Sequence, residues 1–153
     1  PLAGVSVVLR TARALAESGR VDSLVIVTRK ELVAEVSALC GGVKKLHAVV
    51  PGGACRAESV LAGLQALPEG TELAAVHDGA RPLVTVPVID AAIKEAERCG
   101  AAAPALPVHD TIKEAAQGVI LSTPERSRLY AVQTPQVFDA ALLKKALRAA
   151  LDL

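Results

Sequence analysis

The sequence predicts an α/β fold in which a doubly wound, mostly parallel sheet carries one protruding β-hairpin. Two observations indicate it. Along most of the chain, short apolar runs that end in polar or glycine-rich turns alternate with amphipathic helical stretches. Between about residues 108 and 125 this alternation stops, and two short segments flank Gln117-Gly118, which is typical of a hairpin. We expect residues 1–153 to form a single domain.

Five stretches carry apolar residues at the three- and four-residue spacing of an amphipathic helix. In chain order they are residues 5–16, 28–39, 56–67, 89–96 and 143–151. Gly19 follows the first helix, and a Thr28-x-x-Glu31 capping box indicates the start of the second. Thr85 precedes the fourth helix as a capping residue, and Gly100 ends it.

Between the helices, short runs rich in Val, Leu, Ile and Ala predict buried strands. The runs are residues 21–27, 45–50, 73–76, 101–106 and 130–132, and the hairpin adds residues 110–113 and 119–121. The first helix has no strand before it, and the last helix has none after it. In a doubly wound sheet the first strand is commonly central, so we expect the domain to be incomplete at both ends.

Composition and charge exclude several classes of function. The net charge is +1, and the chain has one Phe, one Tyr and no Trp, so it lacks both the basic surface and the stacking aromatics of a nucleic-acid binder. No apolar run approaches the roughly 20 residues that cross a bilayer. Cys40, Cys55 and Cys99 are scattered without metal-ligand spacing, so we expect reduced thiols and a cytoplasmic protein.

The stretch from Val76 to Pro82 is the strongest candidate for a site. It places Asp78, Gly79 and Arg81 where a predicted strand ends, which is the edge of an α/β sheet at which ligands bind. Small residues let a ligand approach the backbone, and a guanidinium group matches the geometry of a phosphate. A tight turn with a solvated ion pair explains the stretch about equally well.

Three further segments combine polar groups with turns. Gly53 and Ser59 lie between a strand end and a helix start, where a plain turn is an equally good interpretation. Thr111, in Asp110-Thr111-Ile112-Lys113, offers a hydroxyl on the hairpin, although an exposed polar strand explains it better on its own. Arg126 and Thr134 flank the strand at residues 130–132 and would make a phosphate clamp, unless Arg126 is simply solvated.

A cysteine nucleophile is a weaker hypothesis. Cys55 and His77 could act as nucleophile and base, but the sequence offers no third group to orient them.

Taken together, four motifs in this order and spacing resemble one family. They are Gly52-Gly53-x-x-Arg56-x-x-Ser59-Val60, Val76-His77-Asp78-Gly79-Ala80-Arg81-Pro82, Asp110-Thr111-Ile112-Lys113 and Gln133-Thr134-Pro135-Gln136-Val137-Phe138. The family is 2-C-methyl-D-erythritol 4-phosphate cytidylyltransferase, a Rossmann-like nucleotidyltransferase of the non-mevalonate isoprenoid route. The resemblance covers essentially the whole chain.

The resemblance implies a reaction in which CTP and methylerythritol phosphate give the CDP-alcohol and pyrophosphate, with Mg²⁺ as cofactor. The substrate phosphate is already an anion, so catalysis consists of positioning and charge stabilisation without a general base. The metal ligands are not identified by the motifs. A second implication is a homodimer built through the hairpin at residues 108–125, which lends side chains to the neighbouring site.

The resemblance also assigns roles to residues. Gly53 and Ser59 would read the cytosine, and Gly79 would lie near the ribose. Methylerythritol phosphate would be held by five side chains, of which the first three are expected to be catalytic: Arg126, Asp78, Arg81, Thr111 and Thr134.

Two alternatives stay open, and one expectation concerns activity. A cytidylyltransferase for ribitol 5-phosphate or another sugar-alcohol phosphate would use the same chemistry, whereas a non-catalytic α/β binding or oligomerisation module would use none. The family's N-terminal glycine-rich loop and its C-terminal segment have no counterpart in the 153 residues. We therefore expect this chain alone to be poorly active.

Overall fold

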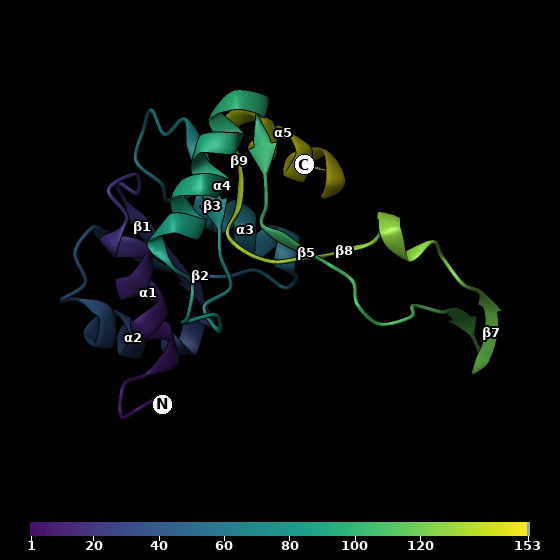
Figure 1. Ribbon diagram of the computed structural model, residues 1–153. Coiled ribbons are helices and arrows are strands. Elements are labelled where there is room, and N and C mark those ends of the chain that lie inside the picture. Colours follow the sequence, from purple (N-terminus) through teal and green to yellow (C-terminus); the bar gives the residue numbers. More distant parts are fainter. Residues whose placement is uncertain (153) are drawn as a thin grey trace.

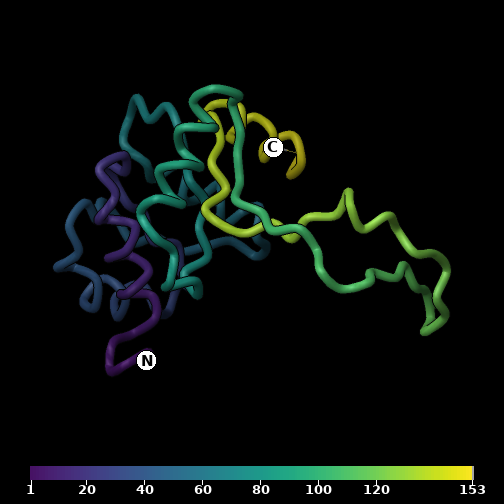
Figure 2. Tube along the Cα trace, viewed as in Figure 1, coloured from purple at the N-terminus to yellow at the C-terminus, as the bar shows by residue number. Residues whose placement is uncertain are grey.

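Two small sheets with helices packed against them make up the body of the protein, and one long arm projects from the body (Figure 1). The computed structural model describes residues 1–152. The trace in Figure 2 leaves the body near residue 105 and returns near residue 130, so both ends of the arm join the body at one place.

The first sheet pairs two parallel strands. They are β1 (Leu24–Thr28) and β2 (Leu46–Pro51). Helices α1 (Val7–Glu17) and α2 (Val33–Cys40) pack on one face, where Leu24 and Ile26 join a core cluster with Val36 and Cys40. On the other face Val27 points at α3 (Arg56–Gln65), because a Cβ added at Gly63 would lie 2.9 Å from it. The alternating side chains of β1 therefore serve two layers of helices.

The second sheet places one strand between two antiparallel neighbours. Its order is β3 (Leu73–Val76), β9 (Gln136–Asp139) and β4 (Ala101–Ala102). Helix α4 (Val86–Cys99) covers one face, and its fully buried Ile89 packs with Val137 of β9. Ala74 of β3 belongs to a separate cluster with Leu64 of α3 and Ala140 of α5 (Ala140–Ala150), so these two helices cover the other face.

The prediction of a mostly parallel sheet is not met by the strands of residues 1–152, where only β1 and β2 run parallel. The reason is β9, which the sequence analysis did not predict as a strand. Gln136–Asp139 is too short for its pattern to stand out, and it becomes a strand by pairing with β3, whose residues lie 60 or more positions earlier.

Helix ends follow the predictions in part. The five predicted helices are present, and Gly100 ends α4 in the left-handed conformation with φ 84°. The prediction that a Thr28-x-x-Glu31 capping box starts the second helix was wrong. A 3₁₀ turn, η1 (Lys30–Leu32), begins after Arg29 with no side-chain cap, and α2 starts only at Val33.

The arm is the segment between two strands that pair at its base. These are β5 (Ala105–Pro107) and β8 (Tyr130–Val132), so the arm spans residues 108–129. Near its tip, β6 (Glu114–Ala116) and β7 (Val119–Ser122) pair antiparallel around the Gln117-Gly118 turn, and η2 (Arg126–Arg128) follows on the way back. The first hairpin strand therefore lies at residues 114–116 and not at the predicted 110–113.

Candidate functional site

The turn that follows β3 holds an ion-pair network around one carboxylate. Asp78 and Arg81 are brought together because the Arg81 N–H donates to the Asp78 carbonyl at 3.0 Å. The Nε of Arg81 then donates to Asp78 Oδ2 at 2.9 Å, and Nη1 of Arg56, from the start of α3, lies 3.4 Å from Asp78 Oδ1. Each carboxylate oxygen therefore faces a guanidinium group from a different segment.

This pairing keeps Asp78 ionised. The hydrogen bond from Arg81 is the largest effect on the pKa of Asp78 and lowers it below its ordinary value. Partial burial opposes that effect, and the charge of Arg56 adds to it. At neutral pH the network is one carboxylate between two cations, so it carries a net positive charge suited to phosphate.

A hydrogen-bonded chain joins this turn to the residues before β9. His77 Nδ1 lies 2.9 Å from Thr134 Oγ1, and His77 Nε2 lies 3.2 Å from the Arg81 carbonyl. The Asp78 N–H donates to the same Thr134 hydroxyl at 3.3 Å. Because Thr134 is buried, its hydroxyl depends on these partners for its orientation.

The segment between β2 and α3 is closed by side chains of the helix it precedes. The Gly53 N–H donates to Ser59 Oγ at 3.1 Å, and the Ser59 hydroxyl donates to the Cys55 carbonyl at 2.9 Å. The carboxylate of Glu58 accepts from the Ala54 N–H at 2.6 Å. A Cβ at Gly53 would collide with the Glu58 side chain, so glycine is needed there for close packing.

Within one chain, the structure brings six of the eight predicted site residues into one region. Asp78, Gly79 and Arg81 share the turn, and Thr134 bonds to its backbone. The Gly53–Ser59 segment is linked to this turn through Arg56. We call these six residues, with Arg56 and His77, the strand-end cluster.

The other two predicted residues lie on the arm. Thr111 is exposed there, and Arg126 Nη1 donates to the His109 carbonyl at 2.8 Å. Neither residue has a contact with the strand-end cluster among the hydrogen bonds of residues 1–152. Lys113, from the same motif as Thr111, donates to Thr123 across the arm at 2.8 Å.

Sequence analysis missed three residues that organise the cluster. Arg56 belongs to the first of the four family motifs, and its position at the start of the helix that follows a strand end was a usable signal. His77 was considered only as a base, although it neighbours Asp78 in sequence. Thr11 donates from α1 to the Gly79 carbonyl at 2.7 Å, and no local pattern indicates a contact across 68 positions.

The structure argues against a Cys55–His77 nucleophile. Both ring nitrogens of His77 have other partners, and Cys55 Sγ lies 3.5 Å from the Glu58 N–H as the cap of α3. No group of three or more His, Cys, Asp or Glu side chains in the described part of the chain could hold a metal ion.

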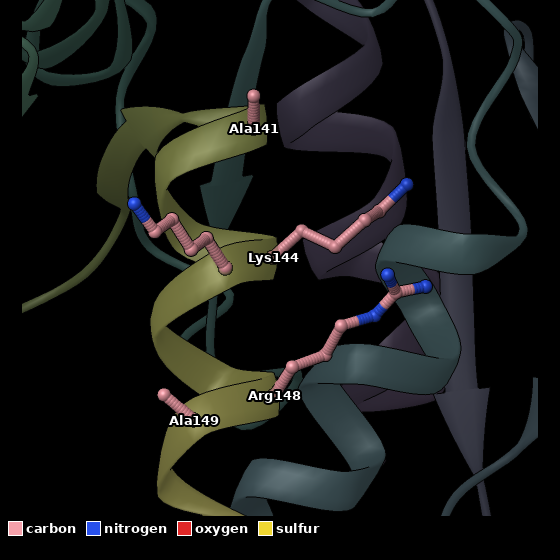
Figure 3. Close-up of a pocket in the computed structure, with 5 residues that line it drawn as sticks. Ala141, Lys144, Arg148 and Ala149 are labelled. Atoms are coloured by element: carbon pink, nitrogen blue, oxygen red, sulfur yellow. The ribbon is translucent and has the colours of Figure 1, made fainter.

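A shallow hollow lies along α5, away from these residues. Figure 3 shows Lys144 and Arg148 on the same side of the helix, and Ala141 and Ala149 also line the hollow. It shares no residue with the strand-end cluster, so its cations are separate from the candidate site.

The helices of residues 1–152 include none with the length and apolar character that a membrane crossing requires.

Known proteins resemble this chain over two thirds of its length or more. A family model described as IspD, 2-C-methyl-D-erythritol 4-phosphate cytidylyltransferase, matches residues 1–152. A protein of that name from Symbiobacterium thermophilum is 44% identical over 99% of this chain and 64% of its own length. Another, from Desulforamulus reducens, is 56% identical over 67% of this chain and 44% of its own length. The chain thus spans less than two thirds of these relatives.

Solved structures agree with this match. The crystal structure of 4-diphosphocytidyl-2C-methyl-D-erythritol synthase from Anaerococcus prevotii superposes with a TM-score of 0.91 at 26% identity. The superposition covers 100% of this chain and 68% of that one.

Proposed function

Since the chain belongs to the 2-C-methyl-D-erythritol 4-phosphate cytidylyltransferase family, we propose that the protein containing it transfers a cytidylyl group from CTP to methylerythritol phosphate and releases pyrophosphate. One observation supports this proposal above the others. Asp78 joins Arg56, from the segment assigned to the nucleotide, to Arg81, from the segment assigned to the alcohol phosphate. The two substrates would therefore meet on one charged network.

The chemistry needs few groups from the protein. The phosphate of the alcohol attacks the α-phosphate of CTP in line, and pyrophosphate leaves from the opposite side. The attacking oxygen is already anionic, so no base has to remove a proton. Arg81 would bind the phosphate charge, and Asp78 would hold that guanidinium group at the right angle through its 2.9 Å bond.

The remaining roles follow the segments of the cluster. Gly53 and Ser59 would bind the cytosine, and Gly79, whose carbonyl is fixed by Thr11, would lie beside the ribose. Asp78 and Thr134 would hold the methylerythritol phosphate molecule together with Arg81, whose guanidinium group would bind its phosphate. The family resemblance supports these assignments, and the hydrogen bonds at Gly53 and Thr134 give them a fixed frame.

We further propose a homodimer in which the arm completes the partner's site. Within one chain Arg126 and Thr111 have no contact with the strand-end cluster among the hydrogen bonds of residues 1–152. Val119, Ile120 and Leu121 are each about 60% exposed near the tip of the arm, where they would be buried by a second subunit. Arg126 and Thr111 would then reach the neighbouring alcohol phosphate.

The family resemblance also implies Mg²⁺. In the described residues Asp78 is the one carboxylate of the strand-end cluster that faces Arg81, and both of its oxygens are engaged by arginines. These residues do not fit a protein-held ion, so we propose that the ion arrives on the phosphates of CTP. No step above depends on it. The free cysteines suit a reducing compartment, and we expect the reaction in the cytoplasm.

A pyrophosphate-release assay tests the function. It should use a protein of the relatives' full length that contains these residues, called the full-length form below, with CTP and either methylerythritol phosphate or ribitol 5-phosphate. We expect turnover with the first alcohol and little with the second. If ribitol 5-phosphate is turned over in preference, it replaces methylerythritol phosphate as the proposed substrate. No turnover with either, together with no heat of CTP binding in calorimetry, would favour a non-catalytic module.

The 153-residue chain should be assayed beside the full-length form. We propose that it binds the alcohol phosphate and turns over slowly, because it carries no glycine-rich phosphate loop. Turnover equal to the full-length form would contradict this.

A further inference from the structure

His77 is the one member of the strand-end cluster whose side chain contacts both the turn and the approach to β9. Its Nδ1 lies 2.9 Å from Thr134 Oγ1, and its Nε2 lies 3.2 Å from the Arg81 carbonyl. The ring therefore spans from a hydroxyl assigned to substrate binding to the backbone of an arginine assigned to phosphate binding.

The partners of the ring settle where its proton lies. A carbonyl oxygen only accepts, so Nε2 must donate to Arg81. In a neutral imidazole the other nitrogen then accepts, so Nδ1 receives the proton of the Thr134 hydroxyl. Thr134 Oγ1 also accepts from the Asp78 N–H at 3.3 Å. The neutral Nε2–H form of His77 is therefore compatible with all three hydrogen bonds, which are those to Arg81, between His77 and Thr134, and from Asp78 to Thr134.

We infer that His77 is a positioning residue which, in its neutral Nε2–H form, fixes the Thr134 hydroxyl and the Arg81 backbone for the alcohol phosphate. This inference rests on the proposed function. With its proton committed to His77 and one lone pair committed to Asp78, Thr134 offers the ligand one remaining lone pair. It is thereby set to accept from a hydroxyl of the alcohol and not to donate to a phosphate oxygen.

Protonation of His77 would reverse this arrangement. An imidazolium donates from both nitrogens, so Thr134 would have to accept from His77 and Asp78 together and turn its own proton toward the ligand. The charged groups that face the ring are Asp78 and Arg81 of its own turn, with Arg56 of α3 behind Asp78, and Thr134 brings no charge. Burial is the largest effect on the pKa of His77 and lowers it, which favours the neutral form.

Two substitutions separate the two contacts of the ring. His77→Asn leaves an amide near the position of Nδ1 and removes the bond to Arg81. His77→Gln places an amide near Nε2 and removes the bond to Thr134. In the full-length form we expect His77→Gln to raise the KM for methylerythritol phosphate about tenfold, with the KM for CTP unchanged. His77→Asn should retain more of the affinity for the alcohol.

The pH profile is the readout that a merely structural role would not change. For the wild type, kcat/KM for methylerythritol phosphate should fall as the pH drops through the pKa of His77, which burial holds below the ordinary histidine value of 6.5. Both variants should lack this decrease of kcat/KM at low pH. Thr134→Val should raise the same KM, and adding His77→Gln to it should cause no further rise. A lower melting temperature in His77→Gln with an unchanged KM and pH profile would overturn the inference.

Imidazole ¹⁵N NMR of the 153-residue chain tests the proton position without any assay. His77 is assigned by the loss of its signals in His77→Gln, and its shifts should be those of a neutral Nε2–H ring. An Nδ1–H or a charged ring at neutral pH would refute the inference whatever the enzyme does. An Nε2–H ring in a full-length form that turns over no alcohol phosphate would instead leave the proton assignment standing and reject the proposed function.

Discussion

Charged residues of the candidate site fall into two groups, one held in the body and one carried on the arm. Arg81 is fixed by Asp78, and its position does not depend on a second subunit. The guanidinium group of Arg126 bonds only to the His109 carbonyl among the hydrogen bonds of residues 1–152. Substitutions in the two groups should therefore differ in what they perturb.

Arg126→Ala should lower kcat of the full-length form at least ~100-fold, because it would remove charge stabilisation from the transferred phosphate. Arg128→Ala is the matched control, since it removes an arginine from the same η2 turn. Steady-state pyrophosphate release measures both. A near-normal rate for Arg126→Ala would exclude this residue from the site.

His77 should also make stability depend on pH. Burial lowers its pKa in the folded chain below the value of 6.5 that it has when unfolded, so the unfolded chain binds the proton more readily. The free energy of unfolding should therefore decrease as the pH falls below about 6.5, until His77 is protonated in the folded chain as well.

Urea unfolding of the 153-residue chain at pH 7.5 and about 5.5, followed by far-ultraviolet circular dichroism, measures this dependence. The difference between the two pH values should shrink in His77→Asn. His47→Asn, a substitution at an exposed histidine of β2, should leave it unchanged. If the free energy of unfolding differs equally between the two pH values in all three proteins, the pKa of His77 does not change on folding.

At this scale the sequence predicted the chemistry of the cluster better than its connections. Asp78 and Arg81 were recognisable because both follow a strand end within five residues. The Arg56–Asp78 pair joins segments 22 positions apart, and the Thr11–Gly79 bond joins segments 68 positions apart. Contacts of this kind depend on how the helices pack, which no local pattern contains.

Among the elements, the arm differs most from the rest of the protein. Among the described strands, β6 and β7 pair only with each other, and all their residues are exposed. A two-stranded hairpin is marginally stable on its own. A partner that covers Val119, Ile120 and Leu121 would provide the burial that the single chain lacks.

Ile120→Lys should therefore weaken the dimer. The side chain is 61% exposed in one chain, so the charge costs little in the monomer but would be buried in the interface. Leu142→Lys, at a side chain that is 55% exposed on α5, is the control. Light scattering after size-exclusion chromatography should give a lower mass for Ile120→Lys alone. A monomeric wild type would refute the dimer.

Mixing two inactive variants tests whether sites are shared between subunits. If Asp78 and Arg126 of one site come from different chains, full-length Asp78→Asn and Arg126→Ala subunits should form heterodimers with one intact site. An equal mixture, after subunit exchange, should regain roughly a quarter of the wild-type activity. No recovery in a mixture that demonstrably contains heterodimers would place both residues in the same chain.

Secondary structure was largely predictable because most helices and strands have strong apolar patterns. β9 is the instructive exception. Its Val137 is fully buried against α4, yet the strand has four residues and lies between β3 and β4 only in the folded chain. The sheet direction therefore could not be predicted without knowing this pairing.

At the scale of the whole molecule, residues 1–152 pack into three small core clusters instead of one continuous core. One contains Ile89 and Val137, another Val36 and Cys40, and the third Leu64. In the described residues, β1 and β2 form no backbone ladder with β3, β9 and β4, so side-chain packing of helices α1, α3 and α4 holds the two sheets together.

Ile89→Ala should lower the free energy of unfolding by about 2–5 kcal/mol, because the side chain is fully buried between α4 and β9. Val119→Ala, at a side chain that is 63% exposed on β7, should change it by less than ~0.5 kcal/mol in the monomer. Urea unfolding of both chains measures the difference. Similar losses would mean that the cluster around Ile89 is not a core.

Tyr130 makes the base of the arm the source of the intrinsic fluorescence of this chain. It is the only tyrosine in a chain without tryptophan, and the residue is 59% exposed on β8 opposite Pro107. The intrinsic fluorescence of this chain therefore comes from the place where the arm meets the body. The Tyr130 emission will change when anything covers β8, and it will change little when β1 and β2 rearrange.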